Sequence, residues 1–220
     1  MPVDKQRSFG TFLFALALVS CETAYRPTLR RLDPVGSNST KVSSENLVAY
    51  VEEYATPNKS ERAFDADLAE AGILPVLLLL ENRGKSPYQI TEIELRDEKG
   101  HALKRLAADE AASQVRRGGI REAVGWSLVV PIVTIPLAAG LSAAHTADVN
   151  SEISRDVKRK TFEQENLNEN TQRSGFVFYQ LESDRRKLTG LRLVIQALNL
   201  ETNHLISISS PLPHVQIMRD

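Results

Sequence analysis

Ile73-Leu74-Pro75-Val76-Leu77-Leu78-Leu79-Leu80-Glu81-Asn82-Arg83-Gly84 is the stretch that decides the fold class. Its first eight residues are nearly continuous in aliphatic side chains, a pattern typical of a strand buried on both faces or of a buried helix. We favour a strand, because the run is short, contains Pro75 and is followed at once by a turn-forming segment. Pro75 argues against a central, fully paired position in a sheet.

The segment after this turn returns as a second strand. Its apolar residues change parity, from Tyr88 and Ile90 to Ile93 and Leu95. A regular strand cannot point both sets to one face, so we predict a β-bulge near Thr91-Glu92.

Further strand patterns lie on both sides of this hairpin. One precedes it at 46–54, and three follow residue 173, at 176–181, 191–197 and 205–209. Antiparallel pairs joined by short turns predict a mainly β fold, an antiparallel β-sandwich of immunoglobulin-like or similar topology. The sandwich is split into residues 46–100 and 173–213.

One brief helix is expected within the first part of the sandwich. It covers Lys59–Ala71, with Ser60 as its N-cap and Gly72 after its end.

The hairpin also carries a resemblance. Leu79-Leu80-Glu81-Asn82-Arg83-Gly84, followed by Ile90 and Ile93, resembles the Asn-centred hairpin in small sandwich domains of the late-embryogenesis-abundant type. The resemblance covers this hairpin alone and implies a small sandwich.

Residues 101–172 differ in character and are predicted to form a largely helical, apolar insertion. Leu103–Val115 is a helical pattern rich in Ala, and 123–147 contains no Asp, Glu, Lys or Arg. Asp148–Asn170 is highly charged, which is typical of an exposed helix with one narrow contact face. That face consists of Val149, Ile153 and Val157.

The charge-free run 123–147 is 25 residues long, enough to span a membrane. A simple span is disfavoured, because it would separate the two halves of the sandwich and place Arg116, Arg117 and Arg121 on the outer side. Three interpretations stay open: a bent or hairpin segment that dips into the membrane, self-association through small residues, or burial against the sandwich.

The N-terminus has the pattern of a signal peptide over residues 1–20. Lys5 and Arg7 precede an apolar run, Phe9–Val19, of the length of a signal-peptide hydrophobic region. Residues 21–45 are polar, with Pro, Gly and Ser, and are predicted to be a flexible tether.

The end of this signal carries a second resemblance. Leu18-Val19-Ser20-Cys21 resembles the lipobox of bacterial lipoproteins. The resemblance implies that Cys21 receives a diacylglyceryl group, that the signal is cut before it, and that the new amino terminus is acylated. Glu22 follows the cysteine, which by the same resemblance implies the outer membrane, facing the periplasm.

Composition excludes some classes of function. The formal net charge is -1 and aromatic residues make up 6%, so no nucleic-acid partner is expected. Cys21 is the sole cysteine, so the fold cannot contain an internal disulfide.

Residues with catalytic or ligand chemistry show no recognisable spacing. The four histidines have no partner at metal-ligand spacing, and Gly84-Lys85-Ser86 lacks the first glycine of a phosphate-binding loop. The carboxylate pairs Glu52-Glu53 and Asp109-Glu110 are adjacent, so we expect them to point apart on solvated faces. The histidines are His101, His145, His204 and His214. The basic cluster Arg185-Arg186-Lys187 is predicted to be a solvated turn.

We therefore predict no catalytic residue, no cofactor and no metal ligand, and one modified residue, the lipidated Cys21. The expected function is a non-enzymatic cell-envelope lipoprotein, a scaffold or partner-binding module for an unidentified envelope protein. Its second contact, with membrane or with itself, is the run 123–147. The alternative is a lipid-anchored hydrolase acting on envelope polymers, with a site that only folding assembles.

Overall fold

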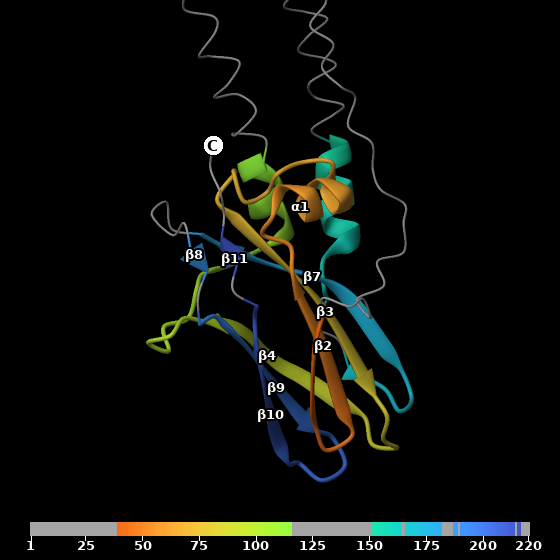
Figure 1. The fold of residues 1–220 in the computed structure, drawn as a ribbon. Helices are drawn as coiled ribbons and strands as arrows, with labels where there is room; N and C mark the ends of the chain where they lie inside the picture. The colour runs from red at the N-terminus through yellow and green to blue at the C-terminus, as the bar shows by residue number, and fades with distance from the viewer. Residues whose placement is uncertain are drawn as a thin grey trace, which may run out of the picture.

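The computed structural model describes residues 39–115, 151–163, 166–181, 187–188, 190–213 and 215–216. The chain is mainly β, with two antiparallel sheets, as the strand patterns predict (Figure 1). Cys21 and the apolar run 123–147 lie outside the described residues.

The first sheet has five strands in the order β1-β2-β3-β7-β5. Its strands are β1 (Thr40–Ser44), β2 (Leu47–Glu53), β3 (Ile73–Asn82), β7 (Gln172–Gln180) and β5 (Arg105–Leu106). All of 73–80 is buried, so the prediction of a strand covered on both faces is confirmed.

The expectation that Pro75 would keep this strand from a central position is wrong. β3 lies between β2 and β7. The reason is that β2 has ended here: its last pair is Glu53 with Val76. On this side Pro75 makes one hydrogen bond, in which its carbonyl accepts from Tyr54 N at 2.9 Å, so its missing N–H is not needed.

The second sheet has four strands in the order β10-β9-β4-β6. They are β10 (Leu205–Pro211), β9 (Arg192–Asn199), β4 (Tyr88–Arg96) and β6 (Asn166–Leu167). The predicted β-bulge is confirmed, because the pairing of β4 with β9 shifts between Ile90 and Glu92. A further pair joins β8 (Lys187–Leu188) and β11 (Val215–Gln216).

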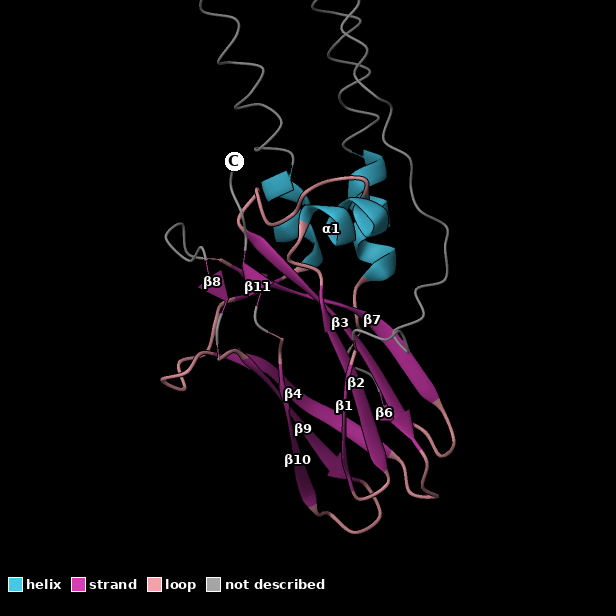
Figure 2. Ribbon diagram, in the orientation of Figure 1, coloured by secondary structure: helices cyan, strands magenta, loops and turns pink. Residues whose placement is uncertain are grey.

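The main core lies between the facing sides of the two sheets. Even-numbered residues of β3 from Leu74 to Leu80 point into it, together with Leu193, Ile195 and Ala197 of β9. Ile73 and Leu77 point to the other side of β3, where the helices pack (Figure 2). This double burial is why β3 is apolar at every position from Ile73 to Leu80.

Three helical segments cover that other side at one end of the first sheet. α1 (Pro57–Phe64) follows β2, and residues 108–115 and 151–160 are also helical. They share an apolar cluster with the sheet, in which Phe64, Phe176 and Phe178 pack at ring-centroid distances of 4.7 to 6.2 Å. We call this the helical end of the domain.

The predicted helix bounds need correction. α1 has Thr56 at its N-cap, and it ends at Asp65, whose φ of 53° is left-handed, well before the expected Gly72. Ser60 is not the N-cap. It is buried inside α1, where its hydroxyl accepts from Leu68 N at 2.9 Å and donates to the Ala66 carbonyl, so it shapes the chain after the helix.

Two other predicted segments differ in their bounds. Thr40–Ser44, placed in the tether, forms β1 instead. In the described part of the insertion, Arg105–Leu106 is a strand, residues 108–115 are helical, and the charged segment is helical at 151–160 but not from 161 onward. After the charged helix the chain returns to the sheets. Thr161 forms a β-bridge with Phe176, and β6 follows.

Gly175 makes this return possible. A Cβ at this position would lie 2.7 Å from both the N and the Cα of Phe162. The close approach lets Phe162 N donate to the Phe176 carbonyl at 2.8 Å. Only glycine leaves room for a backbone at this distance.

Candidate functional site

The helical end is the candidate site, because the chain leaves toward both predicted membrane contacts from it. Thr40, the first residue of β1, pairs with Val51 near the end of β2, just before α1. The helical segments 108–115 and 151–160 border the insertion's apolar run on either side and belong to the same end (Figure 1). The tether of Cys21 and the run 123–147 therefore both connect to the domain at one end.

The two bordering helices are packed together. Ala111, Ala112 and Val157 share one buried cluster with the aromatic residues of β7. At their surface Lys158 Nζ lies 2.8 Å from Asp109 Oδ1. The predicted contact stripe is confirmed for Ile153 and Val157, which pack against this cluster, whereas Val149 lies outside the described residues.

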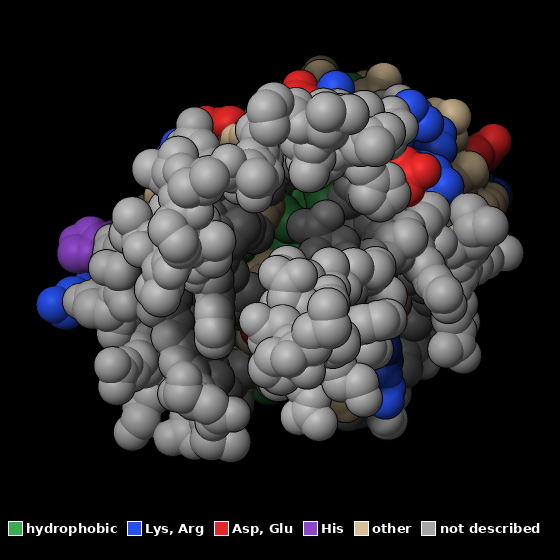
Figure 3. All heavy atoms as spheres, turned by 90° about the horizontal axis from the view of Figure 1, so that it is seen from above, with side chains coloured by type: hydrophobic (Ala, Val, Ile, Leu, Met, Phe, Trp, Pro, Cys, Tyr) green, Lys and Arg blue, Asp and Glu red, His purple; other side chains and the backbone are tan. Residues whose placement is uncertain are grey.

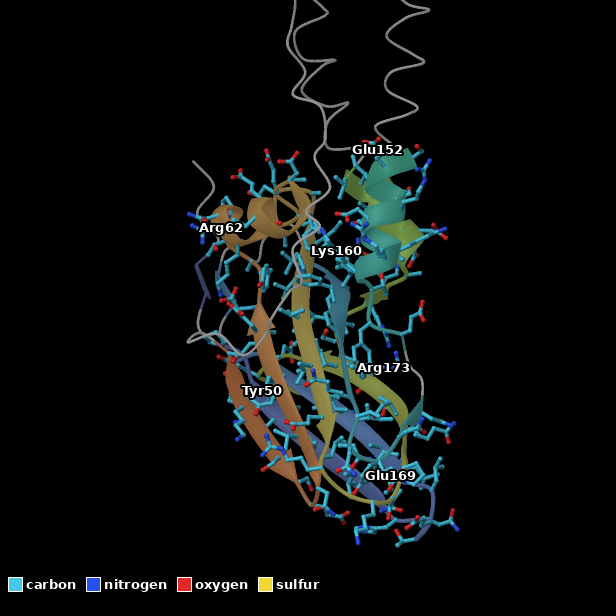
Figure 4. The ribbon with its side chains drawn as sticks, turned by 90° about the vertical axis from the view of Figure 1, so that its right-hand side faces the viewer. Tyr50, Arg62, Glu152, Lys160, Glu169 and Arg173 are labelled. Atoms are coloured by element: carbon cyan, nitrogen blue, oxygen red, sulfur yellow. The ribbon has the colours of Figure 1, made fainter. Side chains whose placement is uncertain are left out.

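A buried ion pair joins the second of these helices to α1. Lys160 Nζ lies 2.6 Å from Asp156 Oδ2, and the two side chains are only 7% and 1% exposed. The same ammonium donates to the Ala63 carbonyl in the last turn of α1. In Figure 4 Lys160 projects from its helix toward α1. Burial lowers the pKa of Lys160, and the bond to Asp156 opposes that shift.

A second buried charge cluster fixes the start of α1 to β2. Lys59 Nζ lies 3.1 Å from Glu52 Oε1 and 2.8 Å from Glu53 Oε1. Both carboxylates are buried, so the expectation that they point apart on solvated faces is wrong. β2 ends at Glu53, and α1 then bends the chain back so that one lysine reaches both.

The neighbouring Tyr54 responds to this cluster. Burial raises the pKa of Tyr54 to about 12, and the charges of Glu52 and Glu53 act in the same direction. Lys59 lies 5.8 Å from the centre of its ring. Lys59 is therefore the cation shared by the carboxylates of Glu52 and Glu53, and the Tyr54 phenol beside them is neutral. This arrangement is suited to holding α1 in place.

The other predicted carboxylate pair and the two described histidines are solvated. Asp109 and Glu110 are both exposed and pair with Lys158 and Lys104 respectively. His101 and His204 are 76% and 65% exposed at their side chains, and they lie in different turns. His145, His214, Arg185 and Arg186 lie outside the described residues.

One pocket, of about 380 Å³, opens at the helical end beside β5. Its walls are mainly apolar, with Arg105, Glu110 and Thr161 as the polar members. Glu110 is already engaged by Ala107 N at 3.0 Å and by Lys104 Nζ at 3.3 Å. The pocket brings together no pair of carboxylates. Its other lining residues are Leu106, Ala107, Ala108, Val177 and Phe178.

The opposite end of the domain is made of turns, and we call it the turn end. Here Glu45 has a left-handed φ of 51°, and its carboxylate accepts from Tyr88 Oη at 3.2 Å and lies 2.9 Å from His204 Nδ1. Burial, followed by the bond to Glu45, raises the pKa of Tyr88. Ser86 donates to Glu201, not to a histidine, so these groups do not form a nucleophile–base pair.

The predicted hairpin is wrong: the turn at Gly84-Lys85-Ser86 connects β3 to β4, but these strands lie in different sheets and do not pair. A Cβ on Gly84 would lie 2.8 Å from the Asn46 Cβ, so the glycine is needed for contact with the β1–β2 turn. Asn82 holds the loop together, since its amide accepts from Gly84 N at 2.9 Å and donates to the Ser86 carbonyl at 2.9 Å. The glycine and lysine here therefore serve a turn and not a phosphate.

Within the described ranges, His, Cys, Asp and Glu form no group of three that could hold a metal ion. The same residues contain no helix with the length and apolar character needed to cross a membrane. Charged side chains of both signs lie along the described margin of the helical end (Figure 3). No protein-family description, curated protein or solved structure matches the chain.

Proposed function

We propose that this chain is a non-enzymatic lipoprotein of the bacterial cell envelope, held by lipid on Cys21 in the outer membrane and facing the periplasm. Its domain is a β-sandwich of immunoglobulin-like or similar topology, interrupted by a largely helical, apolar insertion. It acts as a scaffold that binds another envelope protein. The helical end faces the membrane, and the turn end projects away from it.

The observation that carries this proposal is the common end of the tether and the insertion. Thr40 and the helices 108–115 and 151–160 lie at one end of the first sheet. A lipid on Cys21 and an apolar segment at 123–147 can then reach one membrane surface without crossing the domain. Two anchoring elements hold a protein far more firmly than one acyl chain.

The packing of the two helices argues against a simple membrane span by the run. Because 108–115 and 151–160 share a buried cluster and the Asp109–Lys158 ion pair, the two described helices that flank the run lie at one place. This favours membrane dipping or self-association over a simple span, which would need the two ends on opposite sides of the bilayer.

The orientation can be tested with depth-dependent quenching in vesicles. Glu61, exposed on α1, and Lys85, exposed at the turn end, are each changed to Cys and labelled with an environment-sensitive fluorophore. The lipidated full chain is then reconstituted with lipids that carry a nitroxide quencher. The unsubstituted chain is the blank, because its only thiol is the one that lipid is expected to block.

We expect strong quenching at position 61 and little at position 85. Equal quenching at both, or the reverse order, would contradict the proposed orientation. The anchor itself is tested by Cys21→Ser, which should leave an uncut precursor that incorporates no labelled fatty acid. Normal processing of that variant would overturn the lipoprotein assignment.

A further inference from the structure

β10 is an edge strand that ends in Pro211 and lies close to β1 of the first sheet. It lies at the edge of the second sheet, and Leu205–Pro211 contains no charged residue. Leu205, Ser207 and Ser209 are exposed, whereas Ile206 and Ile208 are buried. Soluble proteins ordinarily protect such an edge with lysine, proline or a bulge in the middle of the strand. The edge strand of the first sheet, β1, does carry an exposed Lys41.

Among the described residues, the outward backbone groups of β10 have no hydrogen-bond partner. Two backbone hydrogen bonds show which residues of β10 face β9. Leu212 N donates to the Leu191 carbonyl, and Asn199 N donates to the His204 carbonyl. Even-numbered residues of β10 therefore bond to β9, and the N–H and C=O groups of the odd-numbered residues point outward. Within the described part of the chain, no backbone group pairs with those of Ser207 or Ser209.

We propose that β10 pairs antiparallel with β10 of a second copy of this chain, with the two-fold axis at Ser207. In this register Ser207 faces Ser207 of the second copy, and Leu205 faces Ser209. A register centred on Ser209 would instead require a backbone N–H from Pro211, which has none.

The second copy fits because the strand is self-complementary. The sequence around Ser207 is Ile206-Ser207-Ile208, which presents the same alternation in both directions. No like charges meet across the pair, because the strand has none. The pair would also cover part of Leu205 and Leu200, which at 52% and 38% are the exposed large hydrophobic residues of the described part.

This inference does not depend on the lipid anchor or on the run 123–147. It uses only the described second sheet, whose outer face is not covered by α1 or by the other two helical segments (Figure 1). The pairing points the helical ends of the two copies in opposite directions, so it joins copies that are not anchored in the same membrane surface. Its failure would leave the membrane orientation untouched.

Disulfide trapping tests the register directly. Residues directly opposite in a hydrogen-bonded antiparallel pair have Cα atoms about 5.5 Å apart, within the range of a disulfide. Ser207→Cys should therefore give a covalent dimer of the full chain on mild oxidation in detergent micelles, where two copies can take opposite orientations. Ser209→Cys should not, because two copies of that position would lie about 13 Å apart along the strands.

Two matched controls complete the design. Ser43→Cys places a thiol on an exposed serine of the other edge strand, β1, and should give no dimer. The unsubstituted chain reports any crosslink through Cys21. The proposal is overturned if Ser207→Cys forms no more dimer than the unsubstituted chain, or if Ser209→Cys or Ser43→Cys forms as much.

Charge exchange gives an independent readout. Ser207→Lys and Ser207→Glu each place like charges opposite one another and should shift sedimentation from dimer to monomer. An equimolar mixture of the two variants should restore the dimer, because opposite charges then meet. A parent chain that is monomeric throughout, or a mixture that stays monomeric, would also overturn the proposal.

Discussion

The buried pair Asp156–Lys160 gives the most quantitative prediction, for the variant Lys160→Met. Methionine keeps the length of the side chain but leaves Asp156, which is 1% exposed, without its buried cation, and the Ala63 carbonyl without its donor. Removing one member of a buried ion pair costs about 3–5 kcal/mol. Arg159 stays 2.5 Å from Asp156 Oδ1 and offsets part of this, so we expect about 2–3 kcal/mol.

Urea unfolding followed by circular dichroism measures this loss. We also expect the Tm to fall by roughly 5–10 °C, at about 2–4 °C per kcal/mol for a chain of this size. Lys158→Met is the matched control on the same helix: its ion pair with Asp109 is exposed, and it should cost below about 1 kcal/mol. Adding Asp156→Asn to Lys160→Met should recover part of the loss.

The result that would refute this reasoning is a Lys160→Met variant as stable as the Lys158→Met control. It would mean that the pair does not hold the helix 151–160 onto α1. The same would follow if the double variant were less stable than Lys160→Met alone, because the destabilisation would then not come from an unpaired Asp156.

Three further predictions concern single positions. Gly175→Ala should destabilise by about 1–3 kcal/mol in urea unfolding, since its Cβ would push the Phe162 backbone away; an unchanged midpoint would contradict this. Ser210→Ala should be neutral or stabilising in the same assay, because the buried Ser210 hydroxyl has no hydrogen-bond partner among the described residues, and a clear loss would show that it has one. Tyr54 holds its proton more tightly when folded, with a pKa of about 12, so stability should fall as pH rises above 10. Tyr54→Phe should weaken that fall, and an identical pH profile would rule out the contribution.

The strands that could be predicted from sequence are those in which the order of apolar and polar residues matches the buried and exposed faces. Residues 73–80 of β3 are all apolar because the strand faces the second sheet on one side and the helices on the other. The change of parity in β4 revealed the bulge, because an inward-facing side chain is required before and after Thr91. These signals are local, so no knowledge of the partner strands was needed.

Other features depend on contacts between distant segments. β1 has an alternating pattern with few apolar residues, so Thr40–Ser44 resembles a linker until it pairs with β2. The burial of Glu52 and Glu53 is invisible in sequence, because it depends on Lys59 being carried back over the sheet by α1. The lysine six or seven residues after the pair was the only available signal.

The pairing of β3 with β7 also has a consequence for how the chain reaches its native state. Ile73 pairs with Gln180 and Leu80 with Arg173, so the most apolar strand must wait for a partner made about 100 residues later. Until then one edge of β3 is unpaired, and the apolar run 123–147 is made in the same interval. Such long-range pairing folds slowly and exposes aggregation-prone surface. The chain should therefore depend on a holding chaperone during its biogenesis, and refolding from denaturant should give the highest yield at low protein concentration.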